Sequence, residues 1–301
     1  MTTKTRYALQ RELSAWGFML PHLVLFLVFM LVPLVINAGI SFYNWSLLGK
    51  KAYIGLGNFE RIIKDDKFWL AVKNTVVFAL ISVPLVMIVG LLFASLLNQR
   101  IYGKLWILVA LVSPTFFGSV GILTTWRWIF ASHSGGLANY YLQKLGLIDR
   151  PLSWFEDPVR AWAIIIFVTV WWIVGFSVLL YLGALRRIPK EQYEAAELDG
   201  AGPLLRFFHV TLPWMRNVLF FDVVRQVLLA FGLFDQVYFF TGGGPAGSTR
   251  TMVYYLYSTA INVQALGRAA AISWYIFAVV LAFALIHLYI LTRSIKSAEE
   301  G

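Results

Sequence analysis

Six long apolar runs limit what this chain of 301 residues can fold into. Each run has at least about 20 residues, which is the length an α-helix needs to cross a lipid bilayer. The runs cover residues 16–40, 75–97, 105–126, 162–185, 218–240 and 269–291. Only 13% of the residues are charged, about half the share of a typical soluble domain. The sequence therefore predicts an all-α integral membrane protein with six transmembrane helices and no separate soluble domain.

The first apolar run could in principle be a signal peptide, because Lys4, Arg6 and Arg11 precede it. It is longer than the apolar part of a signal peptide, and no small-residue cleavage site clearly follows it. We expect a retained first span. Lys and Arg residues are divided equally between the two sides of the membrane, so the positive-inside rule does not orient the chain.

The composition excludes several classes of function. The net charge of +10 is spread over tails and loops, without the basic run that nucleic-acid binding favours, and we interpret it as charge flanking the membrane. The chain has no cysteine, which excludes disulfides and thiolate metal sites. Its four histidines lie in different segments without the spacing of metal ligands, so no metal site is predicted.

The fifth apolar run carries more polar residues than any other. Asp222, Arg225, Gln226, Gly232 and Gln236 recur at intervals that place them on one side of a single helix. Charged groups at membrane depth face the protein interior or a water-filled path. Two interpretations remain open, an Asp222–Arg225 pair closed on itself and a face that lines a translocation route. Small residues four apart, such as Gly90 and Ala94, would also permit close helix packing.

The loop "TGGGPAGSTR", residues 241–250, is within one residue of a phosphate-binding loop. Ser248 stands where that pattern requires the lysine that reaches the β- and γ-phosphates, so we predict no ATP site here. The glycines and proline instead permit positive φ and a tight reversal of the chain.

A second loop, residues 186–217, joins the fourth and fifth runs. Pro189, the glutamates after it, and Gly200, Gly202 and Pro203 predict a helix of about 12 residues, followed by an apolar piece closed by Leu212-Pro213. Helices that lie on lipid head groups are usually basic. This one is acidic, which favours a protein partner, and Ala195 and Ala196 would let that partner approach the backbone closely.

The residues of this loop carry a resemblance. Glu194-Ala195-Ala196, Asp199-Gly200-Ala201 and Leu212-Pro213, at this spacing, resemble the "EAA" loop of permease subunits in binding-protein-dependent ABC importers. Residues 126–130, 188–189 and 241–245 are similar to segments of the maltose-type, carbohydrate-uptake class, particularly of the first of its two paired permeases. The resemblance extends over nearly the whole chain.

The resemblance implies a type I importer fold of six helices in a bacterial or archaeal cytoplasmic membrane. Residues 16–40 would be the first transmembrane helix, and 70–291 would be the transport domain. Residues 194–201 would be the coupling helix, docked on one of two separate ATPase subunits that bind ATP and Mg²⁺, while this chain holds no cofactor. The other partners would be a second permease and an external substrate-binding protein. The loop and both tails, 1–15 and 292–301, would be cytoplasmic.

The resemblance also suggests roles for residues on the outer side and in the route. The turn of Gly242, Gly243, Gly244 and Pro245 would be reached by the docking binding protein, or would simply connect helices. Sugar sites combine aromatic faces with amide and carboxylate groups, and six residues could supply them: Trp171, Trp172, Gln226, Asp235, Gln236 and Tyr238. Packing within the bundle is the alternative for the aromatic members of this set.

Three other classes of function can be compared with the sequence. A secondary transporter commonly shows internal repeats, and none is found in this sequence. An intramembrane enzyme would need a constellation of acids, histidines or serines, and the intramembrane charges are too few to propose a reaction. A permease for a non-carbohydrate solute remains the alternative within the ABC class.

Overall fold

The computed structural model describes residues 3–49 and 51–299. Helices account for nearly all of its secondary structure, which confirms the all-α class. They are α1 (Thr3–Phe26), η1 (Leu27–Leu31), α2 (Val32–Ser41), α3 (Gly57–Ile63), α4 (Asp66–Asn98), α5 (Lys104–Val112), η2 (Ser113–Phe116), α6 (Ser119–Ile129), α7 (Leu137–Lys144), α8 (Pro158–Leu185), α9 (Lys190–Leu198), α10 (Pro203–Arg206), η3 (Phe207–Thr211), α11 (Leu212–Phe231), α12 (Asp235–Phe240), α13 (Met252–Ile261) and α14 (Leu266–Glu299). Strands β1 (Tyr43–Trp45) and β2 (Lys51–Tyr53) form one antiparallel hairpin.

The chain divides into two compact units, one of residues 1–64 and 256–275 and the other of residues 65–255 and 276–301. In the described part of the smaller unit, α1, η1 and α2 form a helical run whose residues 14–41 are long and apolar enough to span a membrane. The side chain of Asn58, which is buried, donates hydrogen bonds to the carbonyl oxygens of Ser41 and Tyr43 and so fixes α3 beside the hairpin.

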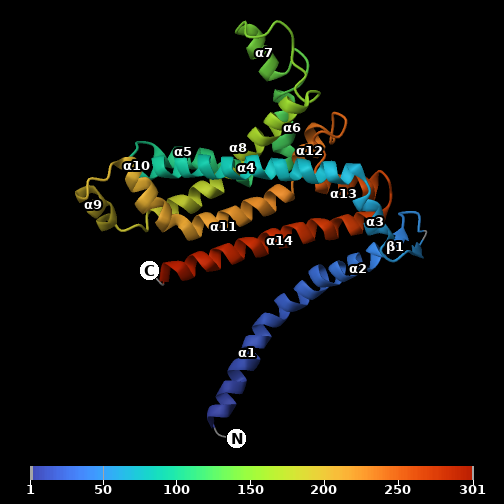
Figure 1. Cartoon of the computed structure of the whole chain (residues 1–301), viewed down its shortest axis with the longest axis horizontal. Helices are drawn as coiled ribbons and strands as arrows, with labels where there is room; N and C mark the ends of the chain where they lie inside the picture. Colours follow the sequence, from blue (N-terminus) through green and yellow to red (C-terminus); the bar gives the residue numbers. More distant parts are fainter. Residues whose placement is uncertain (1–2, 50, 300–301) are drawn as a thin grey trace. The chain divides into compact units, whose positions relative to one another are not determined.

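The larger unit is built on α4, α8 and α11, which lie side by side (Figure 1). Asp65 and Asp157 cap the N-termini of α4 and α8 by accepting hydrogen bonds from backbone N–H groups of the first turn. Gly90 of α4 allows the close approach that the sequence suggested, because a β-carbon there would lie 3.0 Å from the β-carbon of Ser177 on α8. At Gly175, a β-carbon would lie 2.3 Å from the carbonyl oxygen of Leu111 on α5.

The third expected span, 105–126, is not one straight helix. The segments Lys104–Phe116 and Ser119–Ile129 meet at an angle of 105°. Pro114 lies in the tight turn that ends the first segment, and Gly118 adopts an extended conformation before the second. Within the described residues, five helices can cross a membrane, or six if this bent pair counts as one span. The prediction of six spans is therefore met only with a broken third span.

The fifth expected span, 218–240, lies within the candidate membrane span Pro203–Phe240, but the single helix expected for its polar residues is wrong. Helix α11 ends at Phe231, and α12 begins at Asp235. The break leaves backbone carbonyls without partners in a helix, and the hydroxyl of Thr251 donates a 2.7 Å hydrogen bond to one of them, that of Leu233. Such substitution by a neighbouring side chain is what makes a broken membrane helix tolerable.

The loop between α8 and α11 also differs from expectation. Helix α9 has nine residues rather than about 12 and ends before Gly200, whose φ of +80° turns the chain away. Leu212-Pro213 does not close the next piece, because α11 continues directly from η3. The wider π-helical turn bonds the N–H of Leu212 to the carbonyl of Phe207, and Pro213 then falls in the first turn of α11, where its missing N–H is tolerated.

Candidate functional site

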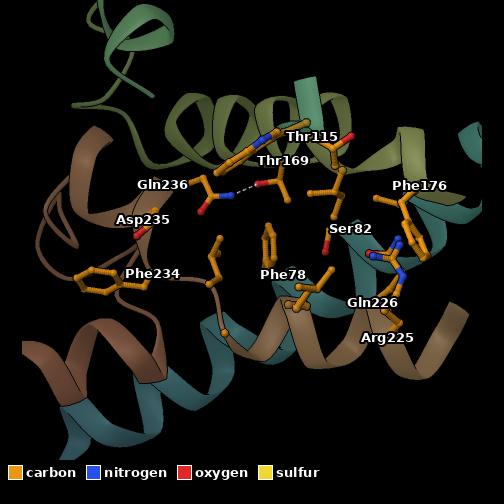
Figure 2. Close-up of a pocket in the computed structure, with 17 residues that line it drawn as sticks. Phe78, Ser82, Thr115, Thr169, Phe176, Arg225, Gln226, Phe234, Asp235 and Gln236 are labelled. Carbon is orange, nitrogen blue, oxygen red and sulfur yellow. Dashed lines mark hydrogen bonds between the residues drawn. The ribbon is translucent and has the colours of Figure 1, made fainter. Parts of the chain in front are cut away.

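A cavity of about 440 Å³ lies in the larger unit between α4, α8, α11 and α12 (Figure 2). Its size is within the range of small-molecule binding sites. The lining residues are Phe78, Ser82 and Val86 of α4, Thr115 of η2, Thr169, Trp172, Ile173 and Phe176 of α8, Arg225, Gln226, Leu229 and Ala230 of α11, Gly232, Leu233 and Phe234 of the break, and Asp235 and Gln236 of α12. Aromatic and apolar walls thus surround a few polar groups.

The cavity brings together four of the six residues predicted for a substrate path, namely Trp172, Gln226, Asp235 and Gln236. The other two lie elsewhere. Trp171 packs edge to face against Trp126, with ring centroids 5.3 Å apart, and Tyr238 stacks on Phe234 at 5.4 Å. The polar residues were expected on one face of a single helix, but they lie on two helices, α11 and α12, on either side of a break.

Both glutamines of the cavity are buried and hydrogen-bonded to α8. The amide of Gln226 donates to the hydroxyl of Ser177 at 3.0 Å, and that of Gln236 donates to the hydroxyl of Thr169 at 3.1 Å (Figure 2 shows the second). These contacts fix the orientation of each amide while its side chain still lines the cavity. The glutamines therefore act both as bonds between helices and as parts of the wall.

A charged cluster lies next to the cavity. The carboxylate of Asp222 is fully buried, and it accepts hydrogen bonds from the Tyr181 hydroxyl at 2.6 Å and from Nε of Arg225 at 3.0 Å. The pair expected as one of two alternatives is thus present. Arg225 also lines the cavity, donates to the Ser177 hydroxyl at 3.2 Å, and lies over the ring of Phe176 at 4.1 Å. Arg225 is thus paired with Asp222 and is also part of the cavity wall, while a translocation route along this face stays a prediction.

The side-chain carboxylate of Asp235 differs from that of Asp222, because it has no hydrogen bond or salt bridge among the described residues. It is partly exposed, lines the cavity and occupies the first turn of α12, where the helix dipole favours a negative charge. It leaves a carboxylate in the wall that can accept hydrogen bonds from a solute.

On the α8 side of this site, the sequence analysis had named only Trp172. Thr169, Trp172, Phe176 and the hydroxyl of Ser177 all contribute to it, and Tyr181 completes the charged cluster. Thr169, Trp172 and Phe176 recur at helical spacing, so a search for weakly polar residues along the fourth run could have found that face. Tyr181 gave no comparable signal, because one tyrosine in an apolar run usually packs.

Six of the eight residues predicted for coupling lie on α9 and the turn after it, at the end of the α4–α8–α11 bundle opposite α12 (Figure 1). Five of them are accessible on α9 or in the turn that ends it: Glu194, Ala195, Asp199 and Gly200 are exposed, and Ala201 is partly buried. Ala196 differs, because it packs with Tyr193 against the core of the bundle rather than facing outward. Tyr193 also shares a 2.9 Å hydrogen bond with the hydroxyl of Thr211, so α9 is attached to η3.

The predicted coupling positions Leu212 and Pro213 begin α11 and are not part of the exposed α9 surface. Leu212 is partly buried, and Pro213 is exposed. Their place in the chain links η3 to the helix that carries Asp222 and Arg225.

No described residue group offers three or more His, Cys, Asp or Glu side chains in a metal-binding arrangement.

The turn at 241–250 is a tightly bonded loop. Gly242 and Gly243 have φ values of +58° and +79°, while the peptide bond between Gly244 and Pro245 is cis. The hydroxyl of Thr249, a buried residue, donates to the carbonyl of Gly244 at 2.7 Å and contacts the Thr241 hydroxyl.

Two helices hold this loop in place. Asn74 of α4 donates to the carbonyl of Arg250, and the Trp162 indole of α8 donates to the carbonyl of Ser248. The predicted tight reversal is confirmed, and it presents a preformed surface rather than an open strand.

Comparisons with known proteins identify the chain's relatives. Residues 67–296 match the family model described as "Binding-protein-dependent transport system inner membrane component". The chain is 34% identical over 290 residues to the trehalose/maltose transport system permease protein MalF of Thermococcus litoralis, covering 96% of each chain. It is 32% identical over 296 residues to the lactose transport system permease protein LacF of Rhizobium radiobacter, covering 96% of this chain and 98% of LacF.

A solved structure shares the fold. It is a bacterial ABC transporter involved in the import of the acidic polysaccharide alginate, and its chain matches with a TM-score of 0.81, 21% identity, and coverage of 96% of this chain and 99% of that one. This likeness confirms the expected type I permease fold. The chain therefore belongs to the family of inner-membrane permease components of binding-protein-dependent ABC transport systems.

Proposed function

We propose that this permease carries a carbohydrate across the cytoplasmic membrane by alternating access. The observation that carries this proposal is the set of relatives that align over most of their length. Their names assign them to lactose, trehalose/maltose, arabinooligosaccharides and sulfoquinovosyl glycerol. All four solutes are sugars or sugar derivatives.

The cavity has the chemistry that a sugar requires. The Trp172 ring offers an apolar face for the C–H groups of a pyranose, and Asp235 offers a carboxylate that accepts bonds from hydroxyl groups. The amides of Gln226 and Gln236 are oriented by α8 and keep acceptor oxygens available. A volume of about 440 Å³ suits a small saccharide better than a long polymer.

The partners follow from the family and the placement of the exposed surfaces. We propose that α9 is the coupling helix and docks on an ATPase subunit through its exposed residues, among them Glu194 and Ala195. The two ATPase subunits would bind ATP and Mg²⁺, and this chain would bind neither. The loop 241–250 lies at the opposite end of the bundle (Figure 1) and would receive the external binding protein. A second permease would complete the complex, with α9 and both termini in the cytoplasm.

Reconstitution tests this function. Proteoliposomes holding this permease, its partner permease and the ATPase subunits should take up radiolabelled lactose, trehalose or maltose when the binding protein and ATP are supplied. The purified permease alone should hydrolyse no ATP, since its glycine loop lacks the phosphate-binding lysine. Uptake that continues without the ATPase subunits but stops when the ion gradient is dissipated would refute the proposal.

A further inference from the structure

A second hollow lies between α8 and α11, closer to α9. This groove of about 490 Å³ is lined by Leu179, Leu180, Gly183 and Ala184 of α8, by Arg187 of the turn after it, and by Trp214, Asn217 and Val218 of α11. None of these residues lines the cavity described above. The groove therefore needs its own explanation.

Helical register places the groove on the same faces as the cavity. On α8, Leu180 follows the cavity residue Phe176 by one turn, and Gly183 follows it by two turns. On α11, Val218 and Trp214 precede the cavity residue Arg225 by two and three turns. Since residues at such intervals share one face of a helix, groove and cavity lie along the same faces of α8 and α11, and we call the two hollows together the track.

One pair of side chains marks the end of the cavity that is nearer in sequence to the groove. Phe176 and Arg225 lie together at one end of the cavity, away from Asp235 and Gln236 (Figure 2). The guanidinium lies 4.1 Å from the ring centroid, and its Nε and Nη2 are held by Asp222 and Ser177. A side chain fixed by three contacts forms a defined partition rather than a loose constriction.

We propose that this groove is a second, inner binding site for the transported saccharide, which reaches it from the cavity when Phe176 and Arg225 separate. The inference rests on the proposed function. The Trp214 ring is 51% exposed and can stack on a sugar face, and the Asn217 amide and the Arg187 guanidinium can bind hydroxyl groups. Neither Asn217 nor Arg187 has a side-chain hydrogen bond among the described residues.

The rest of the groove suits release. Leu179, Leu180 and Val218 offer no hydrogen bonds, and a β-carbon on Gly183 would meet nothing within 4 Å, so that wall is smooth and open. A solute held by fewer polar groups than in the cavity is retained less strongly. A site on a path must bind well enough to be entered and weakly enough to be left.

Cysteine accessibility tests the inner site, and the chain has no native cysteine to interfere. Leu180→Cys and Val218→Cys would be made in the assembled importer, in inside-out vesicles. A charged, membrane-impermeant methanethiosulfonate would be added from the α9 side. The matched control is Met215→Cys, on the same helix as Val218 but fully buried in the core of the bundle. Both groove cysteines should react at least about tenfold faster than the control, which reacts only after local opening.

The partition is tested in the same vesicles. From the α9 side, Gln226→Cys should stay unlabelled until Phe176→Ala or Phe176→Leu removes part of the barrier, and labelling should then rise at least about tenfold. Size-exclusion chromatography would show that each variant remains in the complex. Groove cysteines as slow as the control would overturn the inner site, because lipid or the second permease then covers the groove.

Failure of the proposed function gives a different result. If Gln226→Cys were never labelled from the binding-protein side, the cavity itself would not lie on a path. Labelled groove cysteines with a reactive Gln226→Cys from the outer side support both proposals. A reactive Gln226→Cys with unreactive groove cysteines removes the inner site alone.

Discussion

Replacing Asp222 would measure how much its buried ion pair with Arg225 contributes to the stability of the cavity wall. Its carboxylate is 0% exposed and compensates Arg225 at 3.0 Å while accepting the Tyr181 hydroxyl at 2.6 Å. Asp222→Asn keeps the shape of the side chain and removes the charge. The variant thus leaves the arginine without its counter-ion and leaves the tyrosine with a weaker acceptor.

The expected loss can be worked out from these contacts. Removing one partner of a buried ion pair costs about 3–5 kcal/mol, because the remaining charge is left buried. The Arg225 side chain is 22% exposed where it lines the cavity, so water hydrates part of the freed charge. We therefore expect a loss of about 2–3 kcal/mol, or about 30- to 150-fold in the unfolding equilibrium constant.

The free energy of unfolding would be measured by titrating the purified permease with sodium dodecyl sulfate in mixed micelles. Asp235→Asn is the matched control, since Asp235 lines the same cavity with no partner among the described residues, and it should change stability by less than about 0.5 kcal/mol. Asp222→Asn combined with Arg225→Met should recover at least about 1 kcal/mol relative to the sum of the single losses. A loss no larger than that of the control would refute the assigned ion pair.

Three further predictions concern other parts of the larger unit. Ala195→Arg adds bulk to the exposed side of α9 and should lower ATP hydrolysis by the assembled importer about tenfold, without changing its unfolding temperature. Unchanged hydrolysis would contradict docking of the ATPase at this helix. Gly175→Ala should cost about 1–3 kcal/mol in the same detergent titration, because the new β-carbon meets the α5 backbone, whereas Gly183→Ala has open space and should cost almost nothing. Thr249→Val removes the hydroxyl that donates a hydrogen bond within the 241–250 loop, and it should weaken the affinity for the binding protein several-fold in a sedimentation assay. The control Ser248→Ala removes a hydroxyl without a partner and should leave that affinity unchanged. Equal affinities of the two loop variants would speak against a preformed docking surface.

The membrane-spanning framework was predictable because apolar run length is a local property. The breaks were not, although their residues were visible. Pro114 and Gly118 precede the bend in the third span, yet proline alone does not break a membrane helix, as Pro84 inside the unbroken α4 shows. Whether a helix breaks depends on whether a neighbour satisfies the freed carbonyls. In the fifth span that neighbour, Thr251, lies 18 residues from the carbonyl it serves.

The candidate site was predictable on α11 and much less so on α8. Placing a charged side chain in lipid costs free energy, so Asp222 and Arg225 had to face protein or water. This constraint follows from the sequence alone. Which of the two they faced depended on Ser177 and Tyr181, two residues whose types occur freely in membrane helices. The sequence could therefore name the polar groups but not the partners that orient them.

The position of the charged cluster connects the two ends of the proposed mechanism. Tyr193 joins α9 to Thr211, the last residue of η3, and α11 begins at the next residue. A displacement of α9 by a docked ATPase would therefore act on the start of α11, and α11 carries Arg225 against Phe176 of α8. Because α8 and α11 meet the partition from opposite sides, a rotation or shift of α11 relative to α8 is sufficient to separate that pair. The π-helical turn at η3 lies in the chain between the exposed helix and this pair, and such turns are frequent at functional sites.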